Sequence, residues 1–216
     1  MANKKAVILL SGGLDSTTTL YYARAKGYKC FCLLFDYGQR HKKELKAAVK
    51  LAKMNKSPYN IVKIALPWSK SALTDRKVKV PEKCKNIGKD IPVTYVPARN
   101  TIFLSFAASF AESIGANKIF IGANALDYSG YPDCRPNYIK AYEKAVNLGT
   151  KSGVSGNKLK IETPLISMTK AEIIKLGRKL KVPYDLTWSC YKGGKKPCGV
   201  CDSCLLREKG FEESVK

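Results

Sequence analysis

Short apolar runs alternate with amphipathic stretches along most of the chain. Runs with the length and composition of strands are Ala6–Leu10, Lys29–Phe35, Tyr59–Ala65, Lys118–Gly122 and a shorter Lys158–Pro164. Helical patterns occupy Ser16–Lys26, Lys42–Met54, Thr101–Ile114, Asn137–Leu148 and Thr169–Leu180. This alternation predicts an α/β protein, in which a parallel sheet is covered by helices on both faces.

Two segments fall outside that alternation. Residues from Pro67 to Pro97 form an insertion rich in charge and proline, which we expect to be mobile or to act as a lid. From Pro183 onward the chain is rich in Gly, Lys and Cys. A length of 216 residues suits one domain, so we expect a single domain over 1–216 with a small C-terminal subregion at 184–216.

A Ser-Gly-Gly turn stands where the first predicted strand meets the first predicted helix. Such a turn surrounds an anion with backbone N–H groups, small hydroxyls and the positive end of a helix. No Lys follows the glycines, so the turn is not the loop that ends in Gly-Lys-Ser/Thr. It is better suited to pyrophosphate as a leaving group, with Asp15 as a carboxylate for a magnesium ion (Mg2+). The residues of this candidate nucleotide loop are Leu10, Ser11, Gly12, Gly13, Leu14, Asp15, Ser16 and Thr17.

Four cysteines crowd into the tail with C-x7-C-x2-C-x2-C spacing: Cys190, Cys198, Cys201 and Cys204. Closely spaced thiolates can close a tetrahedron around zinc (Zn2+), and four protein ligands leave no open position, so such a metal is structural. The tail is too short to fold by apolar burial alone, which gives a metal a physical purpose. An iron–sulfur cluster and a set of free thiols are the alternatives.

A polar loop follows the fourth predicted strand, over residues 123–136. Tyrosines can sandwich a flat heterocycle, a carboxylate can accept from two adjacent N–H donors, and an arginine can pair with a carboxylate or a phosphate. An ordinary solvated loop is the alternative. The candidates for substrate binding are Asp127, Tyr128, Tyr131, Asp133 and Arg135, with Asp133 the first choice for reading a base edge.

Charge and hydropathy narrow the classes of partner. The net charge of +22 attracts anions such as ATP, carboxylates or RNA, but the lysines are spread along the whole chain, which favours solubility over a dedicated RNA surface. The apolar run around Ile102–Ala111 is too short to cross a bilayer, and the first residues do not read as an export signal. We therefore expect a cytoplasmic protein with no membrane contact and no direct nucleic-acid partner.

Five stretches together resemble one family. They are LLSGGLDST, FDYGQRH, VPARN, the loop from Asn124 to Arg135 and the terminal cysteine spacing. The first alone is similar to the pyrophosphate (PP) loop shared by many ATP pyrophosphatases. All five closely resemble the 7-cyano-7-deazaguanine synthases, nitrile-forming enzymes of queuosine precursor synthesis, over nearly the whole chain. The resemblance implies a Rossmann-like, adenine nucleotide alpha hydrolase-like fold.

That resemblance implies a definite reaction and set of roles. The substrates would be 7-carboxy-7-deazaguanine, ammonia and ATP, which adenylates the carboxylate, yields an amide and then activates the amide oxygen to leave a nitrile. Asp15, Arg99 and Lys170 would be the catalytic residues, the two cations acting on the phosphate being transferred or released. The resemblance also implies a homodimer.

Two other readings of the chain remain open at this stage. One is an ATP pyrophosphatase that modifies tRNA directly, and the other is a non-catalytic, zinc-stabilised RNA-binding module. His41, the only histidine, could line the adenine or ammonia region or be structural. Cys134 could be a nucleophile, although no histidine lies nearby in the sequence to activate it.

Overall fold

A five-stranded, fully parallel sheet forms the centre of the computed structural model, which describes residues 4–82, 91–124 and 130–215. Its spatial order is β3-β2-β1-β4-β5. The strands are β1 (Lys5–Leu9), β2 (Lys29–Asp36), β3 (Tyr59–Lys63), β4 (Lys118–Ile121) and β5 (Lys160–Glu162). Each predicted strand is therefore present.

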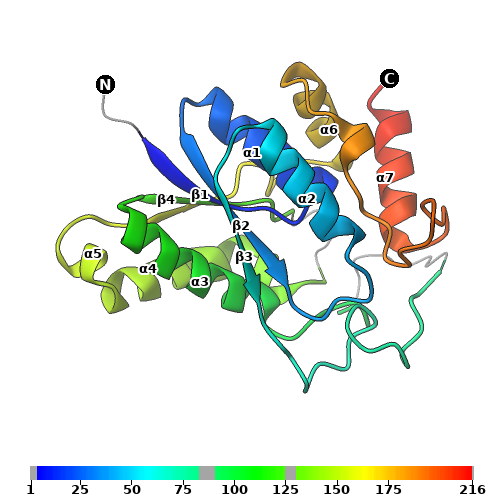
Figure 1. The fold of residues 1–216 in the computed structure, drawn as a ribbon, viewed down its shortest axis with the longest axis horizontal. Coiled ribbons are helices and arrows are strands. Elements are labelled where there is room, and N and C mark those ends of the chain that lie inside the picture. The colour runs from blue at the N-terminus through cyan, green and yellow to red at the C-terminus, as the bar shows by residue number, and fades with distance from the viewer. Residues whose placement is uncertain (1–3, 83–90, 125–129, 216) are drawn as a thin grey trace.

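Helices cover both faces of the sheet, as Figure 1 shows. On one face lie α1 (Leu14–Ala25) and α2 (Lys43–Met54). On the other lie α3 (Arg99–Ile114) and α4 (Pro136–Gly149), followed by the short α5 (Lys151–Val154). The last two helices, α6 (Lys170–Lys179) and α7 (Asp202–Glu213), pack against each other, and α6 also packs on α1. The predicted α/β architecture is confirmed.

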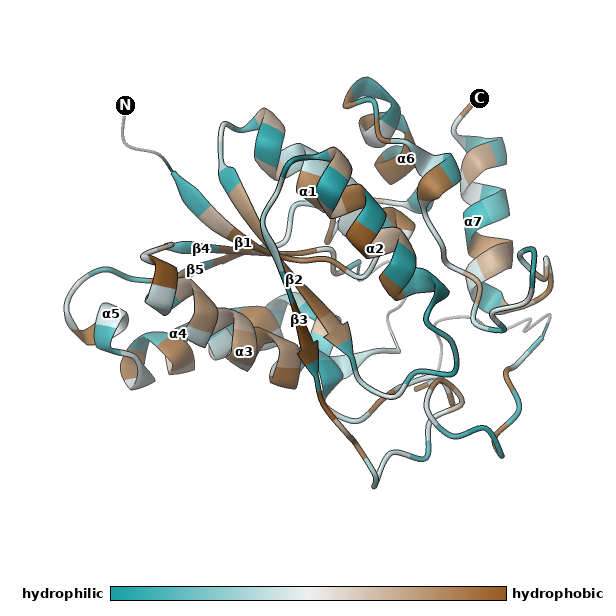
Figure 2. Ribbon diagram, viewed as in Figure 1, coloured by the Kyte–Doolittle hydropathy of each residue, from teal (hydrophilic) through white to brown (hydrophobic). Residues whose placement is uncertain are grey.

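The alternation of side chains along β1 explains the two cores. Val7 and Leu9 face the α3–α4 side, whereas Ala6 and Ile8 face the α1–α2 side, because successive strand residues point to opposite faces. Figure 2 shows the strands as the most continuous apolar part of the ribbon, with mixed colouring on the helices. A sheet buried on both faces is what a parallel βα arrangement requires.

Two predictions about local structure need correction or completion. The tail carries helix α7, which the sequence pattern did not predict, and two short 3₁₀ turns occur at Pro132–Cys134 and Tyr184–Leu186. Within the described part of the 67–97 insertion, Ala72 and Val80 are buried against the tail cysteines, and an isolated antiparallel bridge pairs Glu82 with Cys201. This part of the insertion is packed onto the body.

The order of the strands in the sheet indicates where a ligand site is expected, next to β1. From β1 the chain moves outward to β2 and β3, and then crosses back to β4 on the other side of β1. Open parallel sheets bind ligands beyond the carboxyl ends of their strands at such a reversal. The Ser-Gly-Gly turn leaves β1 at that point.

Candidate functional site

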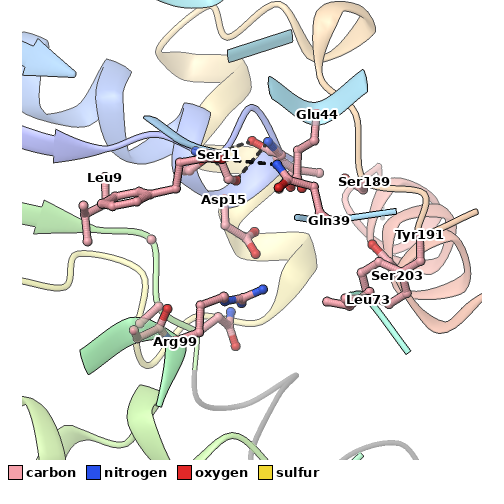
Figure 3. Close-up of a pocket in the computed structure, with 18 of the residues that line it drawn as sticks. Leu9, Ser11, Asp15, Gln39, Glu44, Leu73, Arg99, Ser189, Tyr191 and Ser203 are labelled. Atoms are coloured by element: carbon pink, nitrogen blue, oxygen red, sulfur yellow. Dashed lines mark hydrogen bonds between the residues drawn. The ribbon is translucent and has the colours of Figure 1, made fainter. Parts of the chain in front are cut away.

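A cavity of about 240 Å³ opens beyond the carboxyl ends of β1, β2 and β4. Its wall combines the turn after β1, the chain after β2, the start of α3 and the tail of the protein (Figure 3). The described residues of this wall include the predicted Leu10, Ser11, Gly13, Leu14, Asp15, Ser16, Arg99, Tyr131 and Lys170. Gly12 and Thr17, which also belong to the predicted loop, do not line the cavity.

Hydroxyl groups and one close packing contact shape the turn after β1. Ser16 Oγ accepts from the backbone N–H groups of Ser11 and Gly12, each at 3.2 Å. Gly12 has a φ of +91°, and a Cβ there would lie 2.3 Å from the carbonyl oxygen of Glu44. Only glycine therefore lets α2 pack this closely against the turn.

Thr17 contributes to the helix and not to the wall. Its hydroxyl donates to the carbonyl of Gly13 at 2.7 Å, and the residue is fully buried. The prediction that it offers a donor to phosphate is untested, but here that donor is engaged within α1.

Asp15 and Lys170 form an ion pair across the cavity floor. Lys170 Nζ lies 2.8 and 2.9 Å from the two carboxylate oxygens of Asp15, and the lysine is only 7% exposed. Thr169 and Glu172 close a capping box that begins α6 immediately before this lysine, as the sequence pattern predicted. Two predicted catalytic residues, far apart in the chain, are thus brought together.

Arg99 enters the cavity from the first turn of α3. Its Nη1 donates to Tyr37 Oη at 3.2 Å, and its guanidinium lies 5.6 Å from that ring's centroid and 6.0 Å from that of Phe103. Figure 3 shows Asp15 pointing from the turn toward Arg99. A fixed cation that faces a phosphate-binding turn can neutralise charge that develops between them.

The described residues of the polar loop after β4 lie in different places, some at the cavity and some in the protein interior. Tyr131 lines the cavity, and its hydroxyl lies 2.8 Å from Thr94 Oγ1. Asp133 is 5% exposed, and its carboxylate accepts from Asn100 N at 2.9 Å and from Asn100 Nδ2 at 3.3 Å. The structure therefore places Asp133 against the N-terminus of α3 and does not bring it to the cavity wall.

The other three predicted substrate residues are Arg135, Asp127 and Tyr128, and the structure describes only the first of them. Arg135 is exposed at the start of α4, outside the wall. Asp127 and Tyr128 lie outside the described residues.

The tail supplies the fourth side of the cavity. Ser189 and Tyr191 line it, together with Ser203 and Arg207 from α7. The tail is joined to the first turn directly, because Trp188 N donates to the carbonyl of Gly12 at 3.0 Å. The sequence analysis did not predict these four wall residues. They lie in α7 and in the irregular chain before it, where apolar residues show no helical or strand periodicity.

The four tail cysteines meet at one point beside that wall. Their sulfur atoms all lie within 4.8 Å of one another, and the Sγ atoms of Cys198 and Cys204 are 3.9 Å apart. Tetrahedral zinc with Zn–S bonds of about 2.3 Å separates its sulfurs by roughly 3.8 Å, so the four residues fit such a metal.

The tail thiols differ in acidity. Burial opposes ionisation, but N–H groups of Val200 and Cys201 and the neighbouring thiols lower the pKa of Cys198 to about 7. Burial raises the pKa of Cys201 and of Cys204, so a bound cation would have to supply the charge that favours thiolate at those two residues.

His41 and Cys134 both line the cavity but are engaged elsewhere. His41 Nε2 lies 2.9 Å from the carbonyl oxygen of Cys190, where its N–H donates, and burial lowers the pKa of the ring. Burial also raises the pKa of Cys134 to about 12, which keeps the thiol protonated and makes it a poor nucleophile.

Other wall residues carry signals that sequence reasoning could have used. Tyr37 and Gln39 come shortly after β2, and Asn124 comes shortly after β4. Residues at the carboxyl ends of parallel strands are candidates for ligand binding, so their positions could have identified them. Glu44 also lines the cavity, although on the sequence it looked like one of many charges on an amphipathic helix.

Comparison with known proteins gives consistent matches. A family model described as "Queuosine biosynthesis protein QueC" matches residues 5–215. The chain is 62% identical over 212 residues to a 7-cyano-7-deazaguanine synthase of Picrophilus torridus, covering 97% of this chain and 88% of that one. It is 58% identical to a protein of the same name from Acetivibrio thermocellus, covering 98% and 94%.

Two solved structures share the fold at low identity. The NMN synthetase of Francisella tularensis is 13% identical with a TM-score of 0.52, covering 99% of this chain and 87% of that one. The U34-tRNA thiolase NcsA of Methanococcus maripaludis, solved with its [4Fe-4S] cluster, is 21% identical with a TM-score of 0.51, covering 98% and 65%. At these identities the likeness concerns the arrangement of the backbone.

Proposed function

The chain belongs to the QueC family of queuosine biosynthesis proteins, and we propose that it converts 7-carboxy-7-deazaguanine and ammonia into 7-cyano-7-deazaguanine at the expense of ATP. The observation that carries this proposal is the cavity at the strand reversal, where the Ser-Gly-Gly turn, the Asp15–Lys170 pair and Arg99 face one another. The relatives at 54–62% identity bear the corresponding name. A direct tRNA-modifying enzyme and a non-catalytic RNA-binding module are not favoured by these matches.

The chemistry calls for placement and charge neutralisation. A carboxylate oxygen is a poor leaving group until it carries AMP, so the acid must attack the α-phosphorus of ATP and expel pyrophosphate. We propose that the turn from Ser11 to Ser16 holds the pyrophosphate, while Arg99 and Lys170 neutralise its charge. Asp15 is the carboxylate that would hold magnesium, an ion that binds oxygen ligands and phosphates.

The substrate base is proposed to lie on the Tyr131 side of the cavity. Tyr131 offers an aromatic face and stands next to Tyr95, whose ring centroid is 6.0 Å away. Asp133 is the less direct candidate, because Asn100 already occupies both of its oxygens. Asp127, Tyr128 and Arg135 keep their predicted roles as proposals.

We propose zinc as the resident metal of the four-cysteine site, since the sulfur spacing matches a tetrahedral ion and leaves no open position. When bound, the metal supplies cross-links between tail segments and no reaction step. Chemical analysis of purified protein distinguishes one equivalent of zinc from a coloured iron–sulfur cluster.

We also propose where the enzyme works in the cell and in which oligomeric state. The described cysteines are free thiols, which suits the reducing cytoplasm. Within the described residues, every helix falls short of the length and apolarity needed to cross a bilayer. The homodimer is proposed from the family resemblance alone, and light scattering in solution tests it.

One experiment tests the proposed reaction. The protein is incubated with 7-carboxy-7-deazaguanine, ammonium and ATP, and products are identified by mass. We expect amide and nitrile, with AMP and pyrophosphate. Asp15→Asn is the control, which should release no pyrophosphate while keeping its circular dichroism. Activity that requires tRNA, or no ATP consumption with this acid, would contradict the proposal.

A further inference from the structure

Glu44 is a carboxylate in the cavity to which the proposed function has given no role. It is the second residue of α2, and it projects beside the turn after β1 (Figure 3). A Cβ on Gly13 would lie 3.3 Å from Glu44 Oε1, and the carboxylate also interacts with the hydroxyl of Ser11. It therefore lies at the boundary between the turn and the open cavity.

The other acid–base groups of the described wall are less suited than Glu44 to take up protons. Both oxygens of Asp15 accept from Lys170. His41 donates through Nε2 to the carbonyl of Cys190, and its buried Nδ1 has no hydrogen-bond partner among the described residues. Burial lowers the pKa of that ring below its usual 6.5, so His41 is a weaker base than Glu44. Burial raises the pKa of Cys134 to about 12 and also raises that of Tyr37, so neither gives up its proton readily. Glu44 is the wall carboxylate of the described residues that no lysine or arginine holds in an ion pair within 4 Å.

The reaction needs a base at the nitrogen, and needs it repeatedly. When ammonia attacks the acyl adenylate, a C–N bond forms, the C–O bond breaks with its electron pair going to AMP, and one proton leaves nitrogen. After the amide oxygen attacks the α-phosphorus of a second ATP and expels pyrophosphate, the second C–O bond breaks in the same way. The two remaining protons then leave nitrogen as the triple bond forms.

We propose that Glu44 is the general base that takes these protons from the nitrogen, an inference that rests on the proposed function. Because its carboxylate faces the same cavity as Arg99 and the turn, it can reach a nitrogen that attacks a carbonyl placed between them. Each proton it accepts passes to solvent at the cavity mouth before the next transfer, so that one residue serves both half-reactions.

The electrostatics around Glu44 suit this role. Burial raises its pKa to about 7, against the opposing effects of Arg99 on α3 and the Ser11 hydroxyl. Tyr37 after β2 is the other titratable group that interacts with it, and Asp15, His41 and Lys170 line the same cavity. A base whose pKa lies near the working pH combines a useful ionised fraction with real affinity for protons.

The test separates adenylation from attack by nitrogen. Adenylation is measured without ammonium, as acid-dependent exchange of pyrophosphate into ATP. Amide formation is then measured with ammonium. For Glu44→Gln we expect amide formation to fall about 100-fold or more while adenylation changes by less than roughly threefold. Glu208→Gln, an exposed carboxylate on α7, is the matched control and should change neither step.

Two further readouts distinguish a base from a merely structural residue. Hydroxylamine, whose conjugate acid gives up its proton far more readily than ammonium does, should recover most of the lost rate in Glu44→Gln. At a fixed concentration of free ammonia, the wild-type rate should fall on the acid side of about pH 7, and the variant should lack that limb.

Each other outcome has a clear meaning. If Glu44→Gln loses adenylation as much as amide formation, Glu44 serves phosphate binding or packing and the inference is wrong. If amide formation is unchanged, the inference is wrong as well, while the proposed function stands. If the wild-type protein forms neither amide nor nitrile, the proposed function itself falls.

Discussion

The two walls of the cavity are held in place by different means. The first wall, formed by the turn after β1, is fixed by close packing. Gly12 in that turn lies against the backbone of α2, and Ser16 Oγ accepts from two of the turn's N–H groups. The second wall, residues 188–207, is largely irregular chain around four thiols, and its buried cluster contains few apolar side chains. The first wall depends on steric fit, whereas the second wall has little apolar packing and would depend on the metal proposed for its four cysteines.

The largest expected effect breaks the second wall and spares the first. In Cys201→Ser a fully buried thiol of the proposed zinc site is replaced, and structural zinc contributes roughly 10–16 kcal/mol in small zinc-folded units. We expect loss of the metal, proteolytic sensitivity after residue 187 and no turnover, with the sheet's circular dichroism retained. Metal analysis and limited proteolysis measure this.

A matched cysteine controls that experiment. Cys30→Ala removes a buried thiol from the α1–α2 core, so metal content and tail protection should stay at the wild-type level. Global unfolding of Cys201→Ser would show instead that the two walls share one cooperative unit.

The next effect breaks the first wall. In Gly12→Ala the new Cβ meets backbone atoms of Glu44 and Ala48 at 2.3 and 2.6 Å, and the residue must keep a positive φ. Overpacking and a left-handed backbone together cost about 3 kcal/mol or more, which urea denaturation measures. Gly27→Ala separates the two causes, because it has a φ of +82° and open space around its Cβ; it should cost about 1 kcal/mol.

The smallest effect sharpens the comparison by titrating Glu44, the carboxylate of α2 that lies beside the first wall. Burial raises the pKa of Glu44 to about 7 from 4.5, so the folded state holds a proton that the unfolded state has released. Stability contributed by that proton is present below about pH 4.5 and is lost as the pH rises to about 7. Glu44→Gln should therefore be more stable than wild type at pH 8 by about 1 kcal/mol, allowing for partial solvation, with the difference shrinking toward pH 5. A constant difference across that range would contradict the assignment.

The sequence pattern was a good guide where burial sets the structure. The runs around β1 to β5 and the stretches of α1, α2, α3, α4 and α6 were predicted because apolar periodicity follows the two cores. It failed at α7, whose buried face is made of polar and small residues: Asp202, Ser203, Cys204 and Gly210. Such a face packs against thiols and the stem of Lys170, so no apolar period marks it.

The site was predictable where one motif carries it and unpredictable where distant segments meet. The turn after β1, the grouping of the four tail cysteines and the choice of Lys170 follow from local spacing or from the family resemblance, and the structure brings Lys170 to Asp15 and the four sulfurs together. The binding and catalytic roles of these residues stay predictions. Asp133 was expected at a base edge, yet the 3₁₀ turn at Pro132–Cys134 aims it at Asn100. Glu44 was missed, because the periodicity of α2 does not show that one of its acidic residues lies against the turn after β1.

The hydrogen bond from Trp188 N to the carbonyl of Gly12 joins a late segment of the chain to its first turn, so it forms only after residue 188 has been synthesised. All five strands are encoded before residue 163, so a nascent chain emerging from the ribosome can build its sheet early. The wall residues between Ser189 and Arg207 leave the ribosome only after the strands have done so. The cavity wall is therefore completed only after the thiol-rich segment has been translated.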